Sequence, residues 1–135
     1  MKQVEVVVRV ATVRGVEPAD EKIKRALGVP EVKLEPTDDI LALVAARRKK
    51  TKKPTVVVGF AAESQDLVEN ARGKLEQKGL DLIVANDITA PDAGFGADTN
   101  RVTVLTMTGD PIELPVMGKY QVADYILGQV VKLLA

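Results

Sequence analysis

The chain has 135 residues, 46% of them hydrophobic, and its equal numbers of basic and acidic side chains, 19 of each, give a formal net charge of zero. This length suits one ordinary domain with one core, and the charge balance argues against a general nucleic-acid or membrane-surface binder, which carries a large positive excess. The sequence has no His and no Cys, which excludes a Ser-His-Asp triad, a thiolate nucleophile and a His- or Cys-based zinc site within this chain.

The N-terminal third is predicted to form short strands before a first helix. Val4 to Ala11 alternates with period two and is rich in valine, which predicts a strand with one wetter face. Gly15 to Asp20 is predicted as a loop, and Glu31 to Leu34, which lies between two prolines, as a short strand. Thr37-Asp38-Asp39 then offers N-caps for a helix that ends in the basic run Arg47 to Lys53. We interpret that run as cations opposing the negative end of the helix dipole.

The middle of the chain alternates strands with a helix. Thr55 to Phe60 is a near-continuous apolar run, typical of a central parallel strand. We expect a turn from Gly59 to Ser64, with Ser64 capping a helix that buries Leu67, Ala71 and Leu75 and that ends at Gly79. A further buried strand follows at Leu82 to Ala85.

The last third begins with a long loop and ends in a helix. Asn86 to Asn100 is rich in Asp, Gly and Pro and is predicted as that loop. Arg101 to Met107 is predicted as a strand, Ile112 to Leu114 as its hairpin partner, and Lys119 to Leu134 as the final helix. Residues 1–135 are therefore expected to form a single α/β domain. Its layered, mostly parallel, Rossmann-like sheet would carry packed helices and an antiparallel edge hairpin.

The turn from Gly59 to Ser64 is the first candidate site. Ligands bind at the carboxyl ends of parallel strands, and helix N-termini favour anions. Gly59 would let a ligand approach the backbone, and Phe60 would offer a flat face to a base. The alternative is a tight turn with Phe60 in the core, and the stretch matches neither GxGxxG nor GxxxxGK[ST].

Two charged clusters in the first half of the chain permit a functional and a structural interpretation. Lys22 lies in Glu21-Lys22-Ile23-Lys24-Arg25, which suits either a triphosphate or a solvated face. Asp38 and Asp39 suit a ligand, but N-capping alone also explains them.

The second half holds two further candidates. Lys74 and Lys78 share one helix face, where they would reach a ligand at the preceding turn or pair with neighbouring glutamates. The loop from Asn86 to Asn100 is long for a compact domain, so we favour a functional role for it.

Several of these segments occur together in one known family. "GFAAES" from Gly59, "ARGKLEQKGLDLIVANDI" from Ala71 and "GFGADTNRVTVL" from Gly94 resemble the later half of the phosphopantothenate–cysteine ligase domain, which bacteria fuse to a flavin-dependent decarboxylase. "EKIKR" and "PTDDILALVA" resemble two further motifs of that domain at matching spacing. The match runs from about Val8 to the C-terminus and is densest from Gly59 to Leu105.

The resemblance implies an enzyme that joins 4′-phosphopantothenate to cysteine on the way to coenzyme A. It implies CTP and Mg²⁺, an acyl-cytidylate intermediate and a homodimer. Separately, the absence of cysteine favours a cytoplasmic location. Lys22 falls on the catalytic lysine, which faces the phosphates, and no residue of the chain is assigned as a metal ligand. The implied nucleotide contacts are Asp38, Asp39, Ile40, Leu41, Phe60 at the cytosine, Lys74 and Lys78. The implied acyl-substrate or dimer loop contains Asn86, Asp87, Phe95, Asp98 and Asn100.

The resemblance fails at the N-terminus. The family's first strand, glycine-rich turn and Asn-containing stretch have no counterpart, Thr12 replaces an Asp, and the first strand (residues 1–13) carries Glu5 and Arg9 where the family's strand is small and buried. Two hypotheses follow. The chain is either the C-terminal nucleotide-binding part of a CTP-dependent ligase, or a folded but inactive fragment of that family, truncated or redesigned, that serves as a scaffold or dimerisation module.

Overall fold

The structure is a computed structural model that describes residues 13–16, 31–89 and 96–135. It divides into two compact units, Met1–Leu43 and Val44–Ala135. The predicted strand from Val4 to Ala11 and the basic cluster around Lys22 lie outside the described residues. Among the described residues, no helix combines the length and the apolar character that crossing a membrane requires.

The first unit contains an antiparallel ribbon. β1 (Val13–Gly15) pairs with β2 (Leu34–Pro36), and the exposed side chains of Arg14 and Glu35 form an ion pair of 2.6 Å across it. Two predictions are corrected by this pairing. Gly15 ends a strand instead of opening a loop, and the second strand begins where the predicted one ends, because Gly15 pairs with Leu34. Pro36 closes the strand, as expected for a residue without an N–H to donate.

The helix α1 (Ile40–Thr51) begins as predicted. The Asp39 carboxylate oxygen Oδ1 accepts a hydrogen bond from the Ala42 backbone N–H at 3.1 Å, and the Asp39 carbonyl accepts one from Leu43. This arrangement satisfies N–H groups that have no partner inside the helix. The N-capping role of Asp39 is therefore confirmed.

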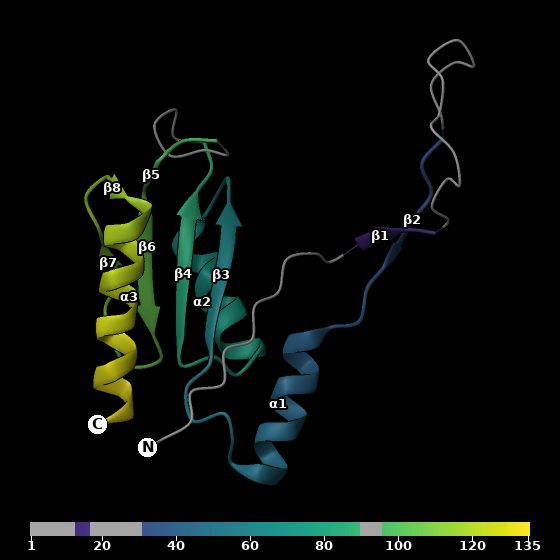
Figure 1. The fold of residues 1–135 in the computed structure, drawn as a ribbon, viewed down its shortest axis with the longest axis horizontal. Helices are drawn as coiled ribbons and strands as arrows, with labels where there is room; N and C mark the ends of the chain where they lie inside the picture. Colours follow the sequence, from purple (N-terminus) through teal and green to yellow (C-terminus); the bar gives the residue numbers. More distant parts are fainter. Residues whose placement is uncertain (1–12, 17–30, 90–95) are drawn as a thin grey trace. The chain divides into compact units, whose positions relative to one another are not determined.

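The second unit contains the main sheet, a small second sheet, two complete helices and the part of α1 from Val44 onward (Figure 1). The sheet has the order β3-β4-β6-β7, in which β3 and β4 are parallel and the other two pairs are antiparallel. β5 and β8 form a separate antiparallel pair. In chain order the elements after α1 are β3 (Val58–Glu63), α2 (Leu67–Gln77), β4 (Leu82–Asp87), β5 (Thr99–Asn100), β6 (Val102–Thr106), β7 (Ile112–Glu113), β8 (Met117–Gly118) and α3 (Lys119–Leu134).

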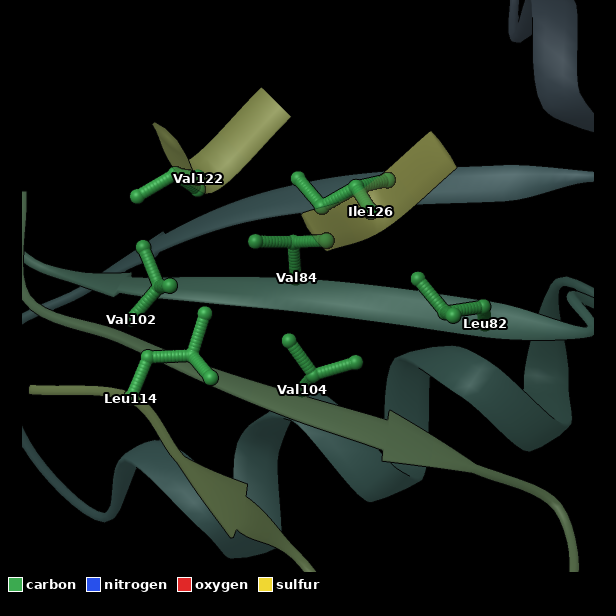
Figure 2. Close-up of a cluster of buried hydrophobic side chains, with 7 residues drawn as sticks. All are labelled: Leu82, Val84, Val102, Val104, Leu114, Val122 and Ile126. Carbon is green, nitrogen blue, oxygen red and sulfur yellow. The ribbon is translucent and has the colours of Figure 1, made fainter. Parts of the chain in front are cut away.

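The two helices cover opposite faces of this sheet. On one face, Val122 and Ile126 of α3 pack against valines and leucines of β4 and β6, and Figure 2 shows Val84 facing Ile126 and Val102 close to Val122. On the other face, Ala71 and Leu75 of α2 are fully buried. Burying one valine, leucine or isoleucine side chain contributes about 1.5–3 kcal/mol. These two layers form the hydrophobic core.

Most predicted elements of the second unit are confirmed, and the shifts have simple causes. The final helix has the predicted bounds, and the hairpin of β6 and β7 is antiparallel as expected. Gly79, at φ 62°, ends α2: its N–H bonds to the Glu76 carbonyl and that of Leu80 to the Leu75 carbonyl, a Schellman motif. The α/β class is confirmed, and the antiparallel share of the described sheet is larger than predicted.

Gly59 has a packing role that differs from the predicted one. A Cβ at this position would overlap the Leu80 side chain, which is 3% exposed and has little room to move. We therefore expect Gly59→Ala to lower the free energy of unfolding by about 1–2 kcal/mol. Gly73→Ala is the matched control, because this helix position has open space around it and alanine favours helix by up to about 1 kcal/mol. Urea unfolding of both variants measures the difference, and equal stability changes would contradict the packing role.

Candidate functional site

The candidate site begins at β3, where the structure corrects the predicted turn. β3 continues to Glu63, so Gly59 to Glu63 are strand residues and the connection to α2 is short. Its side chains alternate: Gly59, Ala61 and Glu63 are buried, whereas Phe60 and Ala62 are exposed. The two alanines suggested a turn, but Ala61 fits in the core and Ala62 pairs with β4.

The start of α2 also differs from the prediction. The N-cap is Asp66, with φ 45° and ψ 43°, and no side chain caps the helix there. Ser64 was expected to be the cap, and this prediction is wrong because the strand extends closer to the helix than its small residues suggested.

Phe60 is 73% exposed, which excludes its alternative role as a core residue. Its register partner on β4 is Val84, a member of the cluster that α3 covers, so Phe60 lies on the α3 face of the sheet. Among the described strands of the four-stranded sheet, β3 lies at one edge and β7 at the other. An aromatic ring therefore stands on the sheet edge with most of its surface accessible to a ligand.

Lys74 lies on the other side of the same strand. Its Nζ makes an ion pair of 2.5 Å with Oε1 of Glu63; the lysine side chain is half exposed and the glutamate side chain is 9% exposed. The pairing with Glu69 or Glu76 that the spacing suggested is replaced by this longer-range contact. Lys78 is the half-buried C-cap of α2, one turn further along. Phe60 and Lys74 thus flank β3 from opposite faces.

The other predicted nucleotide contacts belong to the first unit. Asp38 is exposed, Asp39 caps α1, and Ile40 and Leu41 are half-buried in its first turn. Phe60, Lys74 and Lys78 belong to the second unit. Each of the two groups therefore stands as a candidate within its own unit, and Lys22 lies outside the described residues.

The predicted long loop has strands at both ends. Asn86 and Asp87 are the last residues of β4, and Asn100 pairs with Met117 across β5 and β8. The Asp87 Oδ1 accepts hydrogen bonds from the backbone N–H and the hydroxyl of Thr89, at 2.9 and 2.6 Å. The predicted loop bounds are therefore corrected, because both ends of the segment are hydrogen-bonded in strands.

Of the two remaining residues of the predicted loop, the structure describes Asp98 but not Phe95. The Asp98 carbonyl accepts a hydrogen bond from the N–H of Lys119 at 3.1 Å, which anchors the end of the loop to the start of α3. Phe95 lies outside the described residues.

A cavity of about 490 Å³ lies beside the start of α2, and neither Phe60 nor Lys74 lines it. It is lined by the first turn of α2 and the adjacent ends of β4, β6 and β7. Its charged side chains are Asp66, Glu69, Asp87, Arg101 and Glu113. Carboxylates dominate this lining, so it is unsuited to a polyphosphate, and the sheet edge at β3 is the better candidate for one. Sequence reasoning missed the cavity because its residues come from four separate elements.

The donor set also bears on the implied Mg²⁺. In the part of the chain that the structure describes, no group of three or more acidic side chains is placed to hold a metal. Mg²⁺ commonly binds through substrate phosphates with one or two protein carboxylates. A metal that arrives on a nucleotide fits these residues better than a dedicated protein site.

Comparison with known proteins gives the family. Residues 1–134 match the DNA/pantothenate metabolism flavoprotein C-terminal domain. The coenzyme A biosynthesis bifunctional protein CoaBC of Bacillus subtilis is 43% identical over 132 residues, covering 96% of this chain and 32% of the relative. CoaBC of Escherichia coli K12 is 38% identical over 125 residues, covering 90% of this chain and 30% of the relative.

A solved structure agrees with the sequence relatives. The crystal structure of the C-terminal domain of CoaBC is 41% identical, with a TM-score of 0.59, and the match covers 76% of this chain and 47% of that one. The chain thus spans about a third of the length of its curated relatives. It belongs to the DNA/pantothenate metabolism flavoprotein C-terminal domain family.

Proposed function

We propose that the chain carries the nucleotide-binding part of a ligase of coenzyme A biosynthesis. In this reaction CTP activates 4′-phosphopantothenate as an acyl-cytidylate, and the amine of cysteine then displaces CMP. The observation that carries the proposal is the arrangement at β3. The exposed Phe60 ring lies on one face of this edge strand, and Lys74, which is ion-paired with Glu63, lies on the other face. The close relatives named for coenzyme A biosynthesis support the choice of pathway.

The roles of the residues follow from their chemistry. Phe60 would stack on the base, and Lys74 and Lys78 would neutralise phosphate charge. Lys22 would face the phosphates during transfer, and Asp38, Asp39, Ile40 and Leu41 would contact the nucleotide at the start of α1. Mg²⁺ would enter with CTP on its phosphates. Nucleotidyl transfer to a carboxylate needs positioning and charge neutralisation, with no protein nucleophile, so a chain without His or Cys suits it.

Phe60→Ala tests the base-binding role. A ring that is 73% exposed contributes little to packing, so we expect the free energy of unfolding to change by less than about 0.5 kcal/mol. The alternative from sequence, with Phe60 in the core, would instead predict a large loss of stability. Loss of a stacking partner should weaken CTP binding about fivefold to tenfold or more.

The matched control for Phe60 is Tyr120→Ala, which removes an aromatic ring that is 87% exposed on α3. It should change neither stability nor CTP binding. Calorimetric titration with CTP, and with ATP for comparison, measures the effect. Equal CTP affinity for the two variants would refute the assignment of Phe60 to the nucleotide site.

We also propose that the chain forms a homodimer. The strand order of the sheet limits which segment can form the contact between the two copies. In the described sheet β6 lies between β4 and β7, so it has no free edge to offer a second copy of the chain. The segment from Asn86 to Asn100 therefore remains the candidate contact. Light scattering at about 50 μM is expected to give about twice the monomer mass of 14.5 kDa, and a clean monomer would contradict the proposal.

A further inference from the structure

Glu63 is a buried acidic residue at the carboxyl end of β3. Its side chain is 9% exposed. Side chains alternate along a strand, so Glu63 faces α2, on the opposite side of the sheet from Phe60. Its backbone is held by the neighbouring strand, because it pairs in register with Asp87 and its carbonyl accepts the N–H of Ile88 at 3.1 Å. The Glu63 carboxylate therefore has a fixed base at the edge of the sheet.

Lys74 reaches this carboxylate from α2. The Cα–Cβ bonds of a helix tilt toward its N-terminus, and the N-terminus of α2 follows the carboxyl end of β3 after a short connection. The Lys74 side chain points back toward Glu63, and its Nζ lies 2.5 Å from Oε1. An ammonium group has three N–H donors, and the lysine side chain is half exposed. A ligand can therefore bind the same ammonium group while the ion pair stays in place.

The burial of the two partners is unequal. The Glu63 carboxylate has lost most of its hydration and requires a cation beside it, whereas Lys74 keeps much of its own. Apolar residues of similar size can often replace a buried ion pair with equal or greater stability. Stability alone is therefore a weak reason for a buried glutamate at this edge, and the pair invites a functional explanation.

The carboxylate has two opposite effects on a phosphate that binds Lys74. A lysine that is free in water samples many rotamers, and a ligand that binds it must restrict them. Pairing with Glu63 restricts the lysine before the ligand arrives, which favours binding. The negative charge of Glu63 also repels a phosphate, which disfavours binding. The sign of the change when this charge is removed therefore shows which effect is larger.

We propose that Glu63 is a positioning residue, whose carboxylate holds the Lys74 ammonium group in place for a phosphate of the bound nucleotide. This inference rests on the proposed function, in which Lys74 neutralises phosphate charge. Glu63 touches no ligand and acts through Lys74. The ion pair persists when the nucleotide binds, and the phosphate accepts hydrogen bonds from the other N–H donors of the ammonium group.

Glu63→Gln is the main test variant, because glutamine keeps the size of the side chain and removes its charge. The lysine that it leaves is half exposed, so the midpoint of thermal unfolding should fall by less than about 5 °C. Glu63→Asp keeps the charge on a shorter side chain and serves as the conservative variant. The matched control is Glu76→Gln, which removes the charge of an exposed glutamate on the same helix as Lys74.

The position of Lys74 is measured first without nucleotide. In proton–nitrogen NMR spectra at low temperature, a lysine ammonium group gives a resolved signal when an ion pair slows the exchange of its protons with water. We expect this signal in the wild-type chain and in Glu76→Gln, and its loss in Glu63→Gln. Lys74→Arg assigns the signal by removing it. A signal that persists in Glu63→Gln would overturn the inference, because Lys74 would then be held without Glu63.

Titrations then test the effect on phosphate binding. CTP, inorganic triphosphate and cytidine are titrated separately, with Mg²⁺ and up to millimolar concentration. We expect Glu63→Gln to weaken the Kd of CTP and of triphosphate about threefold to tenfold, and to leave the Kd of cytidine, which has no phosphate, unchanged. Glu63→Asp should recover part of the loss, and Glu76→Gln should show none. Adding Glu63→Gln to Lys74→Gln should weaken binding no further, because Glu63 acts through Lys74.

The outcomes distinguish this inference from the proposed function. If the wild-type chain binds CTP and Glu63→Gln binds it equally or more tightly, repulsion is the larger effect and the inference alone is overturned. If Glu63→Gln weakens cytidine as much as CTP, the variant distorts the whole site, and the positioning role is again overturned. A wild-type chain that binds neither CTP nor triphosphate overturns the proposed function together with the inference.

Discussion

Replacing Arg48 with alanine is expected to lower the free energy of unfolding by about 2–3 kcal/mol. The Arg48 guanidinium lies 2.9 Å from each carboxylate oxygen of Asp81, and it donates to the carbonyls of Thr55 and Gly79 at 2.8 and 3.3 Å. Asp81 in turn accepts the N–H of Val57 at 2.7 Å. The Arg48 side chain thus joins α1 to the segment that precedes β3 and to the turn that precedes β4.

The magnitude of this effect follows from partial burial. Both side chains of the Arg48–Asp81 pair are 28% exposed. Solvent therefore screens their attraction less than in a surface ion pair and more than in a fully buried one. The alanine variant removes the guanidinium group, so the carbonyls of Thr55 and Gly79 and the carboxylate of Asp81 lose their hydrogen-bond donor. Lysine at this position keeps the charge but not the bidentate geometry, so Arg48→Lys should lose part of the stability.

The neighbouring Arg47 supplies a matched control. It is exposed and belongs to the same basic run, so Arg47→Ala should change stability by less than about 0.5 kcal/mol. Urea unfolding of the variants, with a double-mutant cycle through Asp81→Ala, measures the coupling. If Arg48→Ala and Arg47→Ala unfold at the same midpoint, Arg48 does not anchor the turn.

The Arg48 contacts show what a sequence pattern misses. The basic run suggested cations opposing a helix dipole, which describes its exposed lysines but not Arg48. The partner Asp81 is 33 residues away, and no local spacing connects the two. The same limit applies to Lys74, whose partner Glu63 lies beyond the reach of helix spacing rules. Such long-range pairs depend on how helices and strands pack together, and the periodicity of the sequence carries no information about that packing.

The fold was more predictable where periodicity was strong. The final helix and the hairpin of β6 and β7 follow from apolar spacing and a Gly-Asp turn signal, and both are confirmed. The start of β3 was placed too early because Val56 and Val57 extend the apolar run before the strand. Its end was placed too early because Gly59, Ala61 and Ala62 are small. A turn and a closely packed strand use the same small residues, so their sequence signals coincide.

For the candidate site, residue types were more informative than geometry. Phe60 and Lys74 were singled out from sequence. In the structure Phe60 projects from one face of β3, and Lys74 of α2 reaches Glu63 on the opposite face. The role of Gly59 was misjudged, because its hydrogen makes room for Leu80 instead of a ligand. Asn86 was assigned to a loop, and its place in β4 became visible only once the strand register was known.

The 135-residue chain alone is expected to bind CTP weakly and to turn over far below about 1 s⁻¹, the lower range of ordinary enzymes. It matches 47% of the solved C-terminal domain of CoaBC. Contacts on the matched part must order themselves without the rest of that domain, which weakens binding. Candidate contacts such as Asp38 and Phe60 also lie in different compact units of the chain.

Catalysis should be reduced more than binding. Charge that develops at the activated carboxylate needs donors already in place, and the loss of one such donor typically lowers kcat by about 10²–10³. The resemblance implies glycine-rich and Asn-containing segments that serve the phosphates and the intermediate, and the prediction assumes that these 135 residues do not supply them. The resemblance also implies an Asp at the position of Thr12, and a threonine supplies no carboxylate. Two or more such deficits together should leave turnover at least about a thousandfold below that of the longer relative.

The measurement is pyrophosphate release from CTP, 4′-phosphopantothenate and Mg²⁺, with and without cysteine, and full-length CoaBC of Bacillus subtilis is the positive control. Release by the control and almost none by the chain is the expected result, and it fits both the nucleotide-binding part of a ligase and the inactive-fragment alternative. CTP titration then separates these two, since only the former binds CTP in preference to ATP and loses that binding in Phe60→Ala. Turnover near 1 s⁻¹ by the chain alone would contradict the prediction. In that case the sequence before Gly15, including Thr12, supplies by another route the groups that the family takes from its first segments.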